Sequence, residues 1–354
     1  MPSTDIDPAS VAALNAVAHA LEIDQTRAVR HATNGYTWWI APGLRQRVSV
    51  ETGPPHGTRW LRIESPVWRR ADPATIAPLL DALRRHARGA AVLHAPKSGN
   101  ASLVTRFPLP ASATATRARA LAGTGAIQAF LAAWAWGEAR TRFGARAAAW
   151  RDAIAHPDLG MDTPPDPVLT YRDRVLRPGT AAREGAFADA LLAATAEAIE
   201  RTGLGLMPRR PSDDGPITFA VDLGPTLGYL EVGLLGGPVD TRSLVVVLTV
   251  PGHLTEARAE ACGHELLLRQ LGPNAAAWTL GSWMPAPRRD GRPGFGLEHG
   301  LFLPLALAEA DIGPEIAAAT SRTVETVRAW FEDGAPAPVA VPLREGDARQ
   351  HLVA

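Results

Sequence analysis

The sequence predicts an α+β protein of two tandem units, each an antiparallel sheet with helices packed mainly on one face. Three observations lead to this fold class. Apolar runs of strand length recur along the chain, segments of helical periodicity separate them, and the second half returns to the order of the first. Each unit is expected to run helix, three strands, helix, two strands, helix.

The clearest strand signal lies in the second half of the chain. The run from Leu244 to Val250 is almost entirely apolar or β-branched, which predicts a strand buried on both faces, and Pro251-Gly252 interrupts the run. Helical spacing follows from Thr255 to Leu271. This strand and helix form the centre of the second unit.

The first unit begins with an apolar helical pattern over residues 8–22, where Asp7 is placed to cap the helix and Pro8 suits its first turn. Asp72-Pro73 opens the middle helix, which ends at Gly89. The closing helix is expected from about 115 to 143. The strands are expected in YTWWIA, RQRVSVET and RWLRIESPVW before the middle helix, and in AAVLHA and ASLVTRFPLPA after it.

The second unit repeats this order. Its first helix is expected in REGAFADALLAATAEAIERTG and its last at about 311–331. Its strands are expected in ITFAVDLG, LGYLEVGLLG and SLVVVLTV, then in AAWTLGSWMP and FGLEHGLFLPLA. The agreement in element order predicts a duplication.

The predicted boundaries follow from composition. Residues 1–150 form the first unit and 184–333 the second. Residues 151–183 are rich in Pro, Asp and Gly and form a linker or covering segment. Residues 334–354 form a flexible tail, in which APVAVPL offers a short docking strand.

The composition and charge of the chain limit which partners and which cellular compartment we expect. The 36 basic residues balance the 36 acidic ones, so no global charge favours nucleic acid or an anionic membrane, although a local basic patch stays open. No apolar run is long enough for a transmembrane helix, and the acidic start lacks the pattern of a secretory signal. The single cysteine fits a reducing cytoplasm, and the Arg- and Ala-rich composition is typical of a GC-rich bacterial genome.

No catalytic or metal-binding pattern emerges, so we expect a protein that is not an enzyme and needs no cofactor or metal. Cys262 and His264 lie two positions apart on a helix and face different ways, which favours a buried structural cysteine. Glu298 and His299 point to opposite faces of a strand. The alternative is a small-molecule enzyme or sensor whose site gathers dispersed residues, for example His253, His264 and Glu298.

The order of elements, with apolar strands such as SLVVVLTVPG and ASLVTRFPLPA, resembles the type III secretion chaperone fold and its YbjN-like relatives. The resemblance covers about 1–143 and again about 184–331. It implies a chaperone or adaptor that binds a protein or peptide client, with the duplicated chain acting as a monomeric pseudo-dimer. It implies no catalytic residues.

Alternation along the strands supplies candidate residues for a peptide groove. Trp38 and Trp39 must face opposite sides of one strand, so one of them lies on the side away from the helices or beneath a neighbouring element. The predicted peptide-binding residues are Trp38, Trp39, Val48 and Val50 in the first unit and Leu230, Val232 and Leu234 in the second. Two other interpretations stay open: plain core packing, and an exposed sheet that joins a larger complex as a structural subunit.

Overall fold

The structure is a computed structural model of the 354-residue chain. It describes residues 8–21, 23, 25–31, 34–53, 58–87, 89–95, 97–109, 115–152, 181–209, 216–236, 242–272, 278–288, 291–305, 308 and 312–335. The chain divides into two compact units, Met1–Arg177 and Pro178–Ala354. The predicted α+β class with two antiparallel sheets is confirmed.

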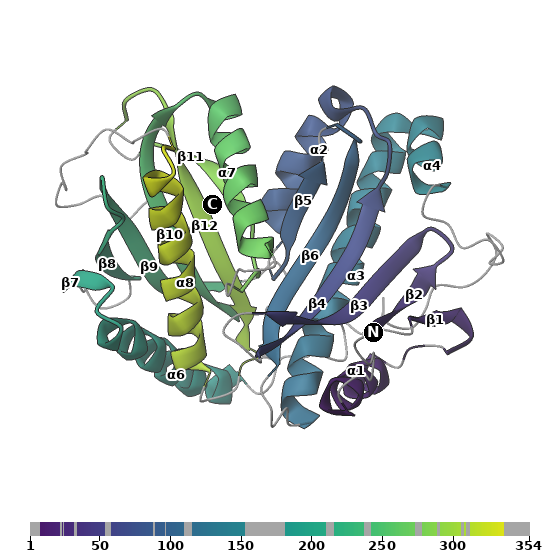
Figure 1. Cartoon of the computed structure of the whole chain (residues 1–354), viewed down its shortest axis with the longest axis horizontal. Coiled ribbons are helices and arrows are strands. Elements are labelled where there is room, and N and C mark those ends of the chain that lie inside the picture. Colours follow the sequence, from purple (N-terminus) through teal and green to yellow (C-terminus); the bar gives the residue numbers. More distant parts are fainter. Residues whose placement is uncertain are drawn as a thin grey trace, which may run out of the picture. The chain divides into compact units, whose positions relative to one another are not determined.

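The first unit begins with helix α1 and a short 3-10 turn, Gln25–Arg27 (Figure 1). A six-stranded sheet and, among the described residues, three further helices follow. Their bounds are α1 Pro8–Ala20, β1 Ala28–His31, β2 Gly35–Ala41, β3 Leu44–Gly53, β4 Thr58–Trp68, α2 Pro73–His86, β5 Ala91–Ala95, β6 Asn100–Leu109, α3 Ala115–Phe143 and α4 Ala145–Asp152.

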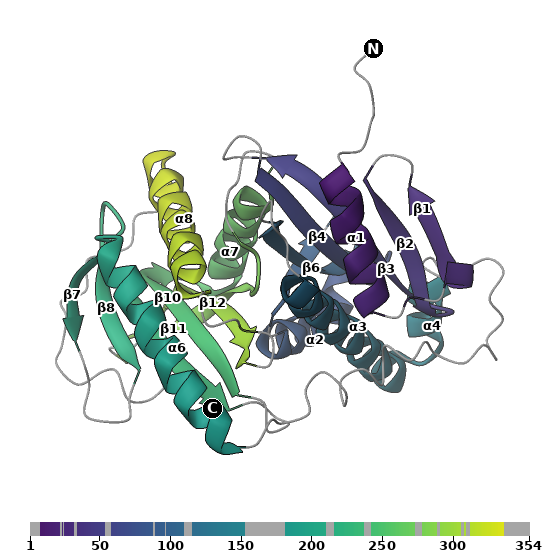
Figure 2. The same cartoon turned by 90° about the horizontal axis from the view of Figure 1, so that it is seen from below.

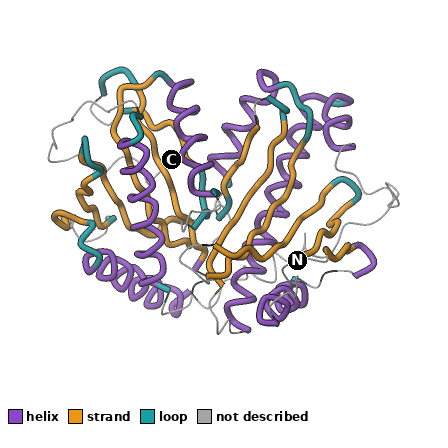
Figure 3. Tube along the Cα trace, in the orientation of Figure 1, coloured by secondary structure: helices purple, strands orange, loops and turns teal. Residues whose placement is uncertain are grey.

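The second unit repeats the pattern of helix, four strands, helix, two strands, helix. Figure 3 distinguishes the helices and the strands of the chain by colour. Its bounds are α6 Ala181–Arg201, β7 Gly205–Arg209, β8 Ile217–Asp222, β9 Leu227–Gly236, β10 Arg242–Leu254, α7 Glu256–Leu271, β11 Trp283–Pro287, β12 Phe295–Pro304 and α8 Gly313–Glu332.

The two sheets have the same topology. The first has the strand order β1-β2-β3-β4-β6-β5 and the second, written in the same sense, β7-β8-β9-β10-β12-β11. All strand pairs are antiparallel. The shared order supports a duplicated unit more strongly than any short run of similar residues.

The predicted count of three strands before the middle helix is too low by one strand in each unit. The missed strands are β1 and β7, the edge strands AVRH and GLMPR. Neither strand has a sustained alternation of apolar and polar residues, and Pro208 interrupts β7. The sequence pattern was therefore too weak to predict these two strands. Helix α4 was also missed, and its last two residues fall within the segment predicted as a linker.

Several predicted features lie wholly or largely outside the described residues. These are the capping residue Asp7, positions 153–180 of the linker, and positions 336–354 of the tail, including APVAVPL.

A buried polar network fixes α3 on the first sheet. Gln128 of α3 accepts a hydrogen bond from the Ser65 hydroxyl at 2.8 Å and donates to the Ile63 carbonyl at 3.1 Å and the Thr105 hydroxyl at 3.2 Å. Gln46 of β3 donates to Ser65 and to the Gly125 carbonyl, both at 3.0 Å. Figure 2 shows α1 and α3 running over this same face.

Gly125 of α3 lies at this contact between the helix and the sheet. A Cβ at Gly125 would lie 3.4 Å from Ile63 and 3.5 Å from Gln46, which is ordinary van der Waals contact, so packing on the sheet does not by itself require glycine at this position.

In the second unit, β10 lies at the centre of the sheet and is buried on both faces. Residues 243–250 are all buried, as the apolar run predicted. On the helix side, His299 of β12 packs against the Trp283 ring with centroids 4.8 Å apart. The Trp283 indole donates a 3.0 Å hydrogen bond to Gln270 of α7, which identifies this face as the one that α7 covers.

Replacing Thr255 by alanine is expected to lower the free energy of unfolding of the second unit by about 1 kcal/mol. The Thr255 hydroxyl accepts a hydrogen bond from the Arg258 amide at 3.3 Å and so caps the first turn of α7. Urea denaturation measures the change. Thr326→Ala on α8 is the control, because among the described residues its hydroxyl bonds only to the Arg322 carbonyl of the same helix. An equal loss in both variants would contradict the capping role.

Candidate functional site

The face of the first sheet opposite the helices is rich in charged residues. The strand register arranges its side chains in rows that cross the sheet. One row runs Val29, Thr37, Arg47 and Glu64 from β1 to β4. The neighbouring rows contain Trp39 beside Arg45, Ser49 beside Arg62 and Arg106, and Glu51 beside Trp60.

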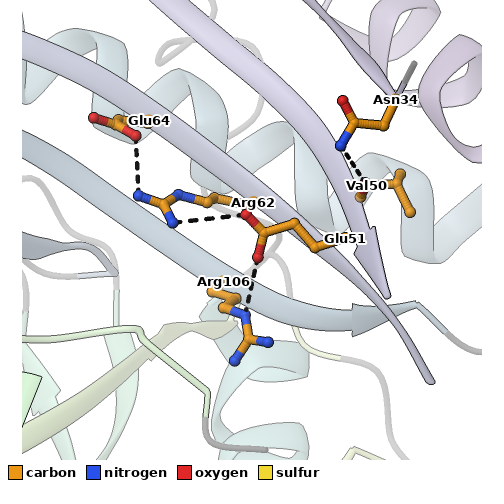
Figure 4. A network of polar contacts seen from close by, with 6 residues as sticks. All are labelled: Asn34, Val50, Glu51, Arg62, Glu64 and Arg106. Atoms are coloured by element: carbon orange, nitrogen blue, oxygen red, sulfur yellow. Dashed lines mark hydrogen bonds and ion pairs between the residues drawn. The ribbon is translucent and has the colours of Figure 1, made fainter. Parts of the chain in front are cut away.

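At the β3-β4-β6 end of this face, four charged residues form an ionic chain (Figure 4). Arg62 contacts Glu64 at 3.1 Å and Glu51 at 3.6 Å, and Glu51 contacts Arg106 at 3.5 Å. The Arg106 guanidinium also lies over the Trp60 ring, 4.2 Å from its centroid. Two cations and two anions thus balance each other here.

Arg106 is more deeply buried than the other members of this ionic chain. Its side chain is only 2% exposed, whereas those of Arg62 and Glu51 are 23% and 32% exposed. Burial lowers the pKa of Arg106, and the Glu51 carboxylate opposes this effect. Arginine keeps its charge under such conditions, so the cation is retained inside a covered part of the face.

The β1-β2-β3 end of the same face is more open and differs in charge. We call Val29, Thr37, Trp39, Arg45 and Arg47 the outer patch. Val29 is 50% exposed, Arg47 is exposed, and Trp39 and Arg45 are partly exposed. The outer patch therefore combines accessible apolar surface with two cations.

The seven residues predicted to bind peptide do not come together in one groove. Five of them, Trp38, Val48, Val50, Leu230 and Val232, are buried on the helix-covered faces of their sheets. Leu234 shares the sheet face of Leu230 and Val232 but is partly exposed. Trp39 alone among the seven lies in the outer patch.

Arginine and glutamate on the opposite face were not among the predicted site residues. The signal was present as polar residues at every second position: Arg45, Arg47, Ser49 and Glu51 in RQRVSVET, then Arg62 and Glu64 in WLRIES. The prediction relied on the apolar residues of the same alternation, which lie on the face that packs against the helices.

The dispersed residues considered for catalysis take separate places. Cys262 is buried on α7, and burial raises the pKa of its thiol, which disfavours the reactive thiolate. His253 contacts Arg288 at the end of β10. Glu298 and His299 point to opposite sheet faces, as their adjacency in a strand predicted.

Within the described ranges, no group of three or more His, Cys, Asp and Glu side chains is arranged to hold a metal ion. None of the helices in those ranges combines the length and apolar character that crossing a membrane requires.

In comparisons with known proteins, no family model, curated protein or solved structure matches this chain.

Proposed function

We propose that this protein is a chaperone or adaptor of the cytoplasm that binds extended segments of client proteins without catalysing a reaction. The observation that carries the proposal is the outer patch, where exposed Val29 and partly exposed Trp39 lie beside Arg45 and Arg47 on the sheet face opposite the helices. The role is the one implied by the resemblance to type III secretion chaperones and YbjN-like proteins. The two units of one chain would take the place of two subunits.

The edge strand β1 offers a second element of recognition. It ends the first sheet and pairs with β2, so its outer side has backbone groups that an added strand can engage. The edge strands of the second sheet suit such pairing less well, because β7 contains Pro208 and β11 contains Pro285 and Pro287, which have no N–H to donate. A client segment along β1 would place side chains against Val29.

A binding experiment with the full-length chain tests the proposal. The probe is a cysteine-blocked, permanently unfolded polypeptide carrying a fluorescent label, and its anisotropy is measured during titration. Val29→Asp puts a charge into the outer patch and is expected to weaken binding at least fivefold, because the charge opposes burial of the client's apolar side chains.

Leu268→Asp is the matched control. Leu268 lies on α7 and is 49% exposed, against 50% for Val29, so each substitution replaces an aliphatic side chain of similar exposure by a carboxylate. The control should bind like the unaltered protein. Equal weakening by both variants, or equally tight binding of the same polypeptide in its native form with its disulfides intact, would rule out a client site at the outer patch.

A further inference from the structure

We propose that the outer patch selects acidic client segments, in which carboxylates at alternate positions of an extended chain pair with Arg45 and Arg47. This inference rests on the proposed function and names the class of segment that the site accepts. It follows from the spacing of the two arginines, the absence of an ion pair to either of them among the described residues, and the apolar surface beside them.

The spacing matches an extended peptide. Arg45 and Arg47 lie two residues apart on β3, so both side chains project from the same sheet face with origins about 7 Å apart. Residues two apart in an extended client have the same separation. A segment with Asp or Glu at every second position can therefore present one carboxylate to each guanidinium, which favours bidentate pairing.

The charge on this part of the face is unbalanced. Among the described residues, neither Arg45 nor Arg47 forms an ion pair, whereas Arg62 and Arg106 are both paired with Glu51. Burial and the neighbouring Arg69 and Arg47 lower the pKa of Arg45, and Glu64 only partly opposes them. A client carboxylate would offset this repulsion between like charges.

The apolar part of the outer patch favours a peptide over a nucleic acid. Trp39 lies beside Arg45, and Val29 lies in the row of Arg47, so a client with apolar side chains near its carboxylates meets matching surface. Single-stranded nucleic acid is held by several aromatic platforms along a basic groove. In the described part of the outer patch, Trp39 is the sole aromatic residue, and Glu64 extends the row of Arg47 with a negative charge.

Two labelled peptides test the inference with the full-length protein. The first alternates Glu with Val over twelve residues, and the second has Gln in place of every Glu. We expect the Glu peptide to bind at least tenfold more tightly at low salt and to lose this advantage as salt is raised, because exposed ion pairs are screened.

Reversing the charges of Arg45 and Arg47 tests whether these two residues cause the preference for the Glu peptide. The double variant Arg45→Glu/Arg47→Glu should lose at least tenfold more affinity for the Glu peptide than for the Gln peptide. The matched control is Arg140→Glu/Arg146→Glu, which makes the same change in net charge at exposed positions of α3 and α4. Circular dichroism of both variants checks that each remains folded.

The outcomes separate this inference from the proposed function. Equal binding of the two peptides, or equal losses in both double variants, would overturn acidic selection while leaving peptide binding in place. Binding of neither peptide nor the unfolded probe would overturn both proposals. Displacement of the Glu peptide by a short oligothymidylate at equal or lower concentration would reassign the outer patch to nucleic acid and also overturn the inference.

Discussion

Replacing Gln128 by leucine is expected to lower the free energy of unfolding of the first unit by about 4 kcal/mol, since several buried polar groups each lose a hydrogen-bond partner at once. Gln128 satisfies Ser65, Thr105 and the Ile63 carbonyl, and its own side chain is fully buried. Leucine has a similar volume but no polar atoms. The loss is therefore one of hydrogen bonding more than of packing.

Hydrogen exchange measured by mass spectrometry in rising urea checks this result unit by unit. Peptides from α3 and β4 should exchange at lower urea in Gln128→Leu, while peptides from the second unit should not change. Arg140→Leu serves as the control because it places leucine at an exposed position of the same helix. A Gln128→Leu protein as resistant as the control would show that the network contributes little to stability.

The second unit is expected to lose about 3 kcal/mol of stability as the pH falls from 6.5 to 4. Burial lowers the pKa of His299 from 6.5 to about 4. Below pH 6.5 the unfolded chain takes up a proton at this residue, whereas the folded chain does so only near pH 4. The neutral imidazole thus contributes stability above pH 6.5 that is lost across this window, and its contribution falls no further below it.

Unfolding of the second unit in urea at pH 7, 5.5 and 4 measures this dependence. His299→Phe keeps a ring against Trp283 but cannot be protonated, so it should remove most of the slope between pH 6.5 and 4. His264→Phe on α7 controls for the general loss of a histidine from the same unit. An unchanged slope in His299→Phe would assign the acid sensitivity to other groups.

Most of the secondary structure followed from the sequence because its signals are local. The helix of residues 115–143 and the strand LGYLEVGLLG match α3 and β9 in both bounds. The helix predicted from Thr255 is α7, with Thr255 as its cap. The edge strands β1 and β7 were not predicted, because their pairing depends on a neighbouring strand more than on their own residues.

The candidate site was harder to predict because alternation separates two sheet faces without telling which one the helices cover. Trp38 and Trp39 were correctly placed on opposite faces, and the structure puts Trp38 beneath the helices, where its indole bonds to Gln46. The same ambiguity led to Val48, Val50, Leu230 and Val232 as binding residues. The choice between faces depends on contacts with α3 and α7 that lie far away in the sequence.

The double burial of β10 has a consequence for synthesis of the chain on the ribosome. The segment 243–250 has apolar residues on both faces and only Ser243 and Thr249 as polar side chains. Its partner β12 begins 41 residues after β10 ends, at Phe295 against Leu254. At roughly 5–20 residues per second, one side of this strand waits for several seconds without its neighbour. During that interval the segment is β-prone and uncharged, as aggregating segments are. The chain is therefore most prone to aggregate before β12 has been synthesised.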